Sequence, residues 1–119
     1  MKYYYNDTLI RTSDHSYTHA VIDTKTGKAV ACRNGIAAAE SARNAEVSFE
    51  RGNIKYYENM IKAMKAGRSY FFYKIGRCTD KARIADDMTV EKAENRIREI
   101  KAWIEQRLNE LIIVPIEAR

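Results

Sequence analysis

The residues best suited to chemistry are basic and aromatic side chains gathered in residues 51–83. This stretch holds nine basic and two acidic residues, a net charge of +7, whereas the whole chain carries only +5. It also holds six of the twelve aromatic residues of the chain. Lysine and arginine neutralise phosphates, and aromatic rings stack on unpaired bases. The combination predicts contact with nucleic acid or with a nucleoprotein.

Nine residues are the candidates for this contact, and they follow one another over the end of a predicted helix, a predicted strand and a loop. They are Lys62, Lys65, Arg68, Tyr70, Tyr73, Lys74, Arg77, Lys81 and Arg83. The basic members would contact phosphates, and the two tyrosines would stack on bases. The structural alternative is that Phe71, Tyr73 and Ile75 fill a core. The basic residues would then stabilise the negative end of the helix dipole.

A second hypothesis is a protein–protein interaction module or a homodimer without nucleic-acid contact. It depends on Trp103, which lies beside the apolar stripe of the last predicted helix. An exposed tryptophan commonly anchors an interface between proteins.

Catalytic patterns are weak. Ser13, Asp14 and His15 are adjacent in the sequence, and their side chains would diverge along an extended segment instead of forming a triad. His15 and His19 lie on a predicted turn and strand, so they need not face one metal ion. We therefore expect no catalytic residue, no metal site and no cofactor.

The third hypothesis is a small metal-dependent nuclease. Asp80, Asp86 and Asp87, together with Lys81, contain the residue types that such a site needs. Nothing in their spacing requires them to converge, and a solvated loop is the simpler interpretation.

Length and composition predict one domain over residues 1–119 of the 119-residue chain. No apolar run is long enough for a transmembrane helix, and the first residues lack the apolar stretch of a signal peptide. We therefore expect a cytoplasmic protein with no membrane partner. Cys32 and Cys78 fit this location as free thiols, with a single bridge between them as the alternative.

Propensity and hydrophobic periodicity predict an α+β fold in the order ββββ-α-β-α-β. Four strands, near residues 3–5, 8–12, 17–23 and 28–33, would form an antiparallel meander. A helix over residues 36–66 would stop at Gly67, with division at Gly52-Asn53 as an alternative. Residues 69–75 would rejoin the sheet, and residues 77–88 would be loop. A helix over residues 90–108, capped by Thr89, and an edge strand over residues 111–114 complete the chain. Both helices would pack on the sheet.

Two parts of the sequence resemble small proteins encoded by phages and mobile elements. The first is Tyr3-Tyr4-Tyr5-Asn6-Asp7-Thr8-Leu9-Ile10-Arg11-Thr12-Ser13 followed by Tyr17-Thr18-His19-Ala20-Val21. The second is Lys65-Ala66-Gly67 followed by the aromatic residues 70–73. Such chains include inhibitors of host defence of the anti-CRISPR type. The resemblance implies a non-catalytic inhibitor that binds a nucleoprotein effector in the cytoplasm of a bacterial host, and it transfers no catalytic residue. The balanced overall charge favours contact through a basic face over mimicry of DNA.

Overall fold

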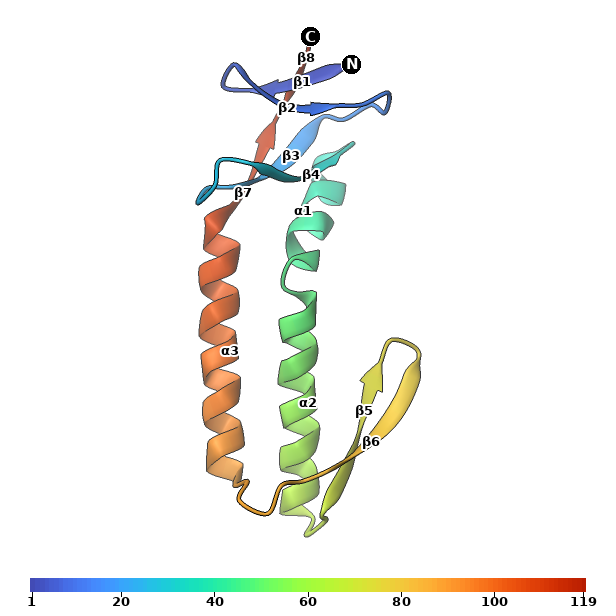
Figure 1. Cartoon of the computed structure of the whole chain (residues 1–119), viewed down its shortest axis with the longest axis vertical. Coiled ribbons are helices and arrows are strands. Elements are labelled where there is room, and N and C mark those ends of the chain that lie inside the picture. Colours follow the sequence, from blue (N-terminus) through green and yellow to red (C-terminus); the bar gives the residue numbers. More distant parts are fainter. The chain divides into compact units, whose positions relative to one another are not determined.

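The computed structural model describes residues 1–119 and has an α+β fold, as the sequence predicts (Figure 1). The helices are α1 (Ile36–Ala45), α2 (Ser48–Lys65) and α3 (Val90–Glu110). The strands are β1 (Lys2–Tyr5), β2 (Thr8–Thr12), β3 (His19–Asp23), β4 (Ala29–Arg33), β5 (Tyr70–Ile75), β6 (Cys78–Arg83), β7 (Leu111–Pro115) and β8 (Glu117–Ala118). None of the three helices combines the length and the apolar character needed to cross a bilayer.

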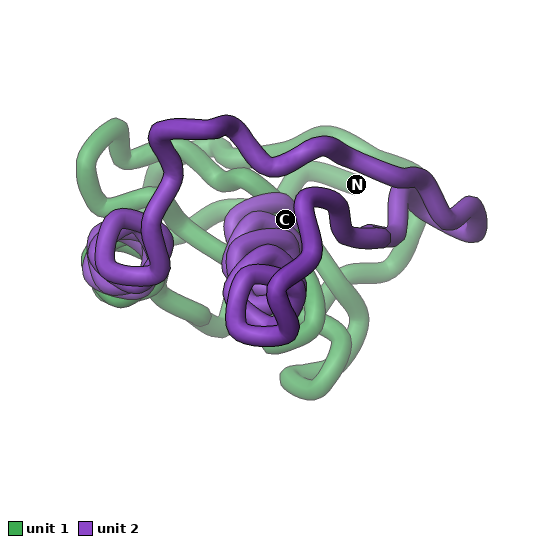
Figure 2. Tube along the Cα trace, turned by 90° about the horizontal axis from the view of Figure 1, so that it is seen from below, with its two compact units in different colours: residues 1–48, 105–119 green, residues 49–104 purple.

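The chain divides into two compact units, which Figure 2 shows in different colours. Unit 1 comprises residues 1–48 and 105–119, and unit 2 comprises residues 49–104. The chain leaves unit 1 after α1 and returns to it along α3. The prediction of a single domain over residues 1–119 stays a prediction.

In unit 1, the predicted four-strand meander is divided between two sheets. The strand order is β2-β1-β8 in one sheet and β4-β3-β7 in the other. Asn6 and Asp7 form the turn between β1 and β2, with φ of 49° and 62°, so this predicted turn pair is confirmed. The prediction that these four strands form a single sheet is wrong. Each of the two N-terminal hairpins, β1–β2 and β3–β4, instead pairs with a strand from the end of the chain. β8 pairs with β1, and β7 pairs with β3.

The middle sheet of unit 1, β4-β3-β7, is buried on both faces. Alternation along β3 places Ala20 and Ile22 on one face, where they pack with Cys32 and Val114 and with partly buried side chains of the other sheet. Val21 lies on the opposite face and packs with Ala39 of α1. The sheet is therefore the middle of three layers, and Val21 and Ala20 are both fully buried.

Tyr3 fixes the loop that enters this sheet. Its side chain is buried, with 1% exposed, and its hydroxyl donates to the carbonyl oxygen of His15 at 2.6 Å. The same hydroxyl accepts the N–H of Tyr17 at 3.0 Å. The polar end of a buried ring is thus fully bonded, as burial requires.

A network of ion pairs joins the end of α3 to β3 within unit 1. Arg107 lies 3.0 Å from the carboxylate of Asp23 and 3.2 Å from that of Glu110. The hydrogen bond from Arg107 lowers the pKa of Asp23, against a smaller opposing effect of burial. The same contact raises the pKa of Arg107. Lys25 completes the network, 3.7 Å from Glu110.

The long helix predicted over residues 36–66 is two helices, and they divide at Glu46-Val47 rather than at Gly52-Asn53. The N–H groups of Glu46 and Val47 bond to the carbonyls three residues earlier, each at 3.2 Å, which tightens the last turn of α1. Val47 is fully buried at this break. Gly52 stays helical, because the packing of α2 overrides its cost of about 1 kcal/mol.

The end of α2 at Gly67 is confirmed. Gly67 has a φ of 73°, and its N–H bonds to the carbonyl of Met64 at 3.0 Å. The N–H of Arg68 donates to the carbonyl oxygen of Ala63 at 2.9 Å. This pair of bonds is a Schellman motif, which satisfies carbonyls that the helix end leaves free. The cap on α3 is also as predicted, since Thr89 Oγ1 accepts the N–H of Lys92 at 3.1 Å.

Unit 2 contains α2, the β5–β6 hairpin and the greater part of α3. Its core joins Met60 and Ala63 of α2 with Phe71 of β5 and Ala93 of α3. Ile84, which follows β6, belongs to the same core. Two predictions fail here. Residues 70–75 do not rejoin the N-terminal sheet, and residues 78–83 are a strand rather than a loop. The reason is local: β5 pairs with β6 in a separate two-stranded sheet, so its backbone groups are satisfied within the hairpin.

Candidate nucleic-acid interface

The β5–β6 hairpin carries most of the candidate residues, and a glycine makes its turn possible. Ile75 pairs with Cys78, which leaves Gly76-Arg77 as a two-residue turn. Gly76 has a φ of 59°, the conformation that such turns require at the first position and that glycine adopts without strain. The register then fixes which residues are cross-strand neighbours, from Tyr70 opposite Arg83 to Ile75 opposite Cys78.

The inner face of the hairpin packs on α2. Phe71 is only 3% exposed, and its ring centre lies 4.9 Å from that of Tyr56 on α2. Tyr73 also faces inward, with its ring 5.0 Å from Tyr56. Burial among these rings raises the pKa of Tyr56, and its proximity to Tyr73 adds to the shift. Asn59 of α2 anchors the strand by donating to the carbonyl of Phe72 at 3.2 Å.

The outer face of the hairpin is exposed and combines aromatic with basic side chains. We call it the outer face, and define it as the side chains that alternate with the buried ones. It consists of Tyr70, Phe72, Lys74, Thr79, Lys81 and Arg83. Phe72 is 53% exposed and Tyr70 is 37% exposed. The face contains three cations and no carboxylate, because Asp80 takes an inner-face position opposite Tyr73.

Two contacts order the side chains of the outer face. The ammonium of Lys81 lies 4.1 Å from the centre of the Tyr70 ring, which is a cation–π contact. The ring of Phe72 lies 5.8 Å from that of Tyr70 at an interplanar angle of 84°, an edge-to-face pair. Arg83 alone has a carboxylate in reach, that of Asp86 at 3.2 Å. Both partners are strongly exposed, so this ion pair contributes little to stability.

The structure separates the nine candidate residues instead of bringing them all together. Tyr70, Lys74, Lys81 and Arg83 share the outer face. Tyr73 lies on the inner face, against Tyr56, so its ring is part of the core contact and is not available to a base. The structural alternative was therefore correct for Phe71 and Tyr73, whereas Ile75 is 58% exposed near the turn.

The remaining candidates lie on α2 and at two turns. Lys62 and Lys65 are exposed on α2, one turn apart. At 100° per residue, they are on the side of α2 turned away from Tyr56 and Met60, which contact the hairpin. Arg68 follows the Schellman turn, and Arg77 lies in the hairpin turn. None of these four residues is part of the outer face, and Lys62 and Lys65 lie on the side of α2 away from the hairpin.

The nine candidate residues do not include Phe72, which is the more exposed of the two aromatic residues on the outer face. The signal was the period of two along a strand, since the even-numbered residues 70, 72 and 74 lie together. Without the partner strand, the alternation could not show which set was buried. Residues 78–83 look like a loop because their only apolar members are Cys78 and Ala82.

Trp103, the candidate of the second hypothesis, lies on α3 and is 46% exposed. Its neighbours in sequence, Lys101 and Ala102, are exposed, while Ile100 and Ile104 are buried. The indole therefore lies at the border between the buried stripe and the solvated side of the helix. Phe49, at the start of α2, is another strongly exposed aromatic residue, with 76% of its surface free.

The metal and thiol candidates do not assemble into a site. No three side chains among the histidines, cysteines and carboxylates lie close enough together to hold a metal ion. His19 Nδ1 is 2.8 Å from the hydroxyl of Thr18. Both cysteines are free thiols, Cys32 buried in unit 1 and Cys78 exposed on the hairpin. Burial raises the pKa of the Cys32 thiol.

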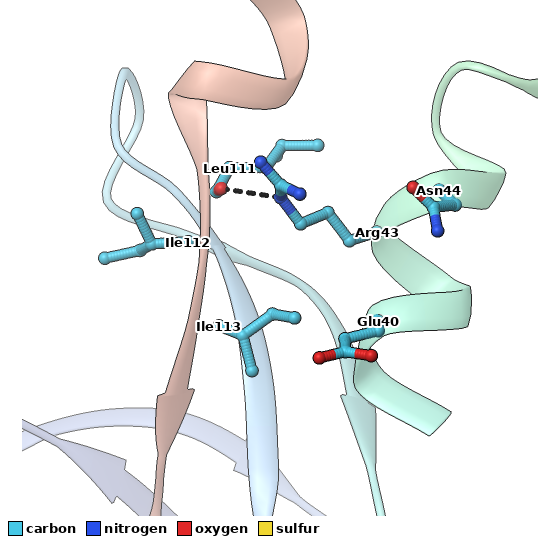
Figure 3. Close-up of a pocket in the computed structure, with 6 residues that line it drawn as sticks. All are labelled: Glu40, Arg43, Asn44, Leu111, Ile112 and Ile113. Carbon is cyan, nitrogen blue, oxygen red and sulfur yellow. Dashed lines mark hydrogen bonds between the residues drawn. The ribbon is translucent and has the colours of Figure 1, made fainter. Parts of the chain in front are cut away.

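One open depression lies in unit 1, between α1 and the edge strand β7 (Figure 3). Its volume is about 470 Å³, and its walls are Glu40, Arg43, Asn44, Leu111, Ile112 and Ile113. The Arg43 side chain extends from α1 to the backbone of Leu111, as Figure 3 shows. The guanidinium of Arg43, the cationic hydrogen-bond donor that lines the depression, therefore already donates to backbone carbonyls of the protein.

Comparisons with family models, curated proteins and solved structures found no match to this chain.

Proposed function

We propose that the protein is a non-catalytic binding protein that contacts unpaired nucleic acid, free or within a nucleoprotein, through the outer face of the β5–β6 hairpin. The observation that supports this is the composition of that face. It places the exposed rings of Tyr70 and Phe72 among three cations. Proteins that bind single strands combine a basic surface for the backbone with aromatic rings for the bases.

Charge complementarity supports the same choice of ligand. Lys74 and Arg83 lie at opposite ends of the outer face, four strand positions apart, a separation of about 13 Å. Lys81 lies between these ends. The three cations are spread along the face, so they suit the extended backbone of a nucleic acid better than a single phosphate group.

The basic residues outside the face would contribute to attraction at longer range. Lys62 and Lys65 add charge on α2, and Arg68 and Arg77 add it at the two ends of the hairpin. Their contribution is a sequence-independent one, which raises the rate of encounter and falls as salt increases. The resemblance to phage-encoded inhibitors leads us to propose further that such contact blocks a nucleoprotein effector of host defence.

The experiment compares two double variants of equal charge. Lys74→Glu with Lys81→Glu reverses two cations of the outer face. Lys28→Glu with Lys101→Glu reverses two exposed lysines elsewhere and changes the net charge by the same amount. Affinity for a fluorescent single-stranded oligonucleotide is measured by anisotropy over a range of salt concentrations.

We expect the outer-face variant to lose about 0.7 from the log–log salt slope for each phosphate contact removed. The control variant should weaken binding slightly and keep the slope of the unaltered protein. Equal losses in the two double variants would refute the assignment of binding to the outer face.

The exposure of Trp103 supports a second candidate function, a protein–protein contact such as a homodimer. Analytical ultracentrifugation at low and high salt tests it. A dimer that persists at high salt and dissociates in Trp103→Ala would support this function, because apolar contacts are insensitive to screening. A monomer at both salt concentrations would refute the homodimer.

A further inference from the structure

The two exposed rings of the outer face have different surroundings. Lys81 covers one face of the Tyr70 ring, with its ammonium 4.1 Å from the ring centre. No cationic side chain lies over Phe72, which is also the more exposed ring, at 53% against 37%. Stacking of a base requires an open ring face, whereas a cation–π contact occupies one.

On the basis of the proposed function, we infer that the two rings do separate tasks. Phe72 stacks on one unpaired base, and Tyr70 is a positioning residue that holds the ammonium of Lys81 for an adjacent phosphate. A lysine side chain loses rotamer freedom when it binds a phosphate. Contact with Tyr70 restrains Lys81 before the ligand arrives, which reduces that loss on binding.

The arrangement specifies the class of ligand as an unpaired strand. Inside a duplex each base is stacked between its neighbours, so Phe72 finds no free base face except at the two ends. The outer face offers one open aromatic ring and no carboxylate that could accept a hydrogen bond from a base edge. A ring can stack on any base, because every base has a π surface. The site should therefore accept any base and reject a fully paired duplex.

The experiment uses three fluorescent probes with identical end labels. One is a single-stranded DNA of mixed sequence, one is the same backbone with abasic sites throughout, and one is the blunt duplex. Each is titrated with the full chain by anisotropy at low salt. The unaltered protein should prefer the base-bearing strand over the abasic strand by roughly tenfold, the worth of one stacked base.

Four variants separate the tasks of the two rings. Phe72→Leu should abolish the preference for bases and leave affinity for the abasic strand unchanged. Tyr70→Leu should keep the preference for bases and weaken binding to the base-bearing and the abasic strand by about two- to fivefold, which corresponds to an exposed cation–π contact. Tyr70→Phe should bind both strands as tightly as the unaltered protein does, because it keeps the aromatic ring. Phe49→Leu, an exposed phenylalanine outside the hairpin, is the matched control and should change nothing.

A double-mutant cycle identifies the positioning role. In a Lys81→Met background, Tyr70→Leu should cause no further loss, since no ammonium remains to be held. If the full twofold to fivefold loss persisted in that background, Tyr70 would contact the ligand itself and the inference would be wrong.

The remaining outcomes distinguish this inference from the proposed function. Loss of the base preference in Tyr70→Leu but not in Phe72→Leu would overturn the division of tasks and leave the proposed function standing. Equal affinity of the unaltered protein for the duplex and the single strand would overturn the choice of an unpaired ligand, on which the proposed function and this inference both depend. Absence of binding to any probe at low salt would overturn the proposed function and this inference together.

Discussion

Arg43 of α1 donates a hydrogen bond from Nη2 to the carbonyl oxygen of Leu108 at 2.5 Å, close to the C-terminus of α3. Its Nε donates to the carbonyl of Leu111 at 3.0 Å. The N–H and the hydroxyl of Thr24 both donate to the carbonyl of Glu110, at 2.8 and 2.7 Å. The carbonyls that a helix end leaves free are thus bonded by side chains and backbone that lie far away in the sequence.

Replacement of Arg43 should destabilise unit 1. Arg43→Met removes two charge-assisted hydrogen bonds, and we expect the free energy of unfolding to fall by about 2–3 kcal/mol. Urea unfolding followed by circular dichroism measures this change. Arg51→Met is the control, since Arg51 is exposed on α2, and its change should stay within about 0.5 kcal/mol. Similar losses in the two variants would contradict the capping role.

The pairing of Asp23 with Arg107 predicts a dependence of stability on pH. The pKa of Asp23 is lowered from its ordinary value of 3.8, so its contribution is complete above about pH 4. That contribution is lost as the pH falls through the lowered value, because the carboxylate of the folded protein is then protonated. The melting temperature of the unaltered protein should therefore fall as the pH decreases below about 4.

Asp23→Asn should melt at a lower temperature at pH 7 and lose less stability on acidification than the unaltered protein. Asp14→Asn, at an exposed position, should reproduce the unaltered profile. Differential scanning calorimetry at several pH values provides the comparison. A profile for Asp23→Asn parallel to that of the unaltered protein would show that Asp23 does not contribute to the acid sensitivity.

Replacement of the two adjacent phenylalanines on β5 should change the stability to very different extents. Phe71 is buried in the core of unit 2, and Phe71→Ala should lower the free energy of unfolding by about 3–5 kcal/mol. Phe72 faces outward, and Phe72→Ala should change it by no more than about 0.5 kcal/mol. Thermal unfolding of the two variants tests the register of the hairpin, since a slip of one residue would exchange the two results.

Two glycines of unit 2 offer a test with opposite signs. Gly67 has a φ of 73°, so Gly67→Ala should destabilise by about 1–2 kcal/mol although no atom obstructs the added methyl group. Gly52 lies inside α2 with open space around it, so Gly52→Ala should stabilise by about 0.5–1 kcal/mol. Melting temperatures that shift in the same direction would contradict the placement of one glycine at the end of α2 and the other within it.

The sequence predicted the elements that depend on local chemistry. The Asn6-Asp7 turn, the stop at Gly67 and the cap at Thr89 were all found where propensity placed them. The helix of regular apolar spacing was predicted over residues 90–108 and extends to Glu110. Its last residues could not be placed from propensity, because Thr24 and Arg43 from elsewhere in the chain complete the helix end.

The candidate site was predicted only in part. Local composition identified residues 51–83 as basic and aromatic, but it could not assign faces to a strand whose partner was unrecognised. Tyr73 was therefore named as a stacking residue although it packs on Tyr56, and Phe72 was left out of the nine candidates although it is exposed.

By itself, then, the sequence determined the α+β class, the Asn6-Asp7 turn, the helix stop at Gly67, the cap at Thr89, and the segment in which positive charge and aromatic rings gather. Each depends on interactions between residues a few positions apart. Tertiary structure alone decided which strands pair and which rings face solvent. The pairing of β7 with β3 and of β8 with β1 joins residues about a hundred positions apart, and no local propensity specifies such contacts. The outer face exists because β6 pairs with β5 and α2 covers one side of the hairpin, which leaves Tyr70 and Phe72 on the other.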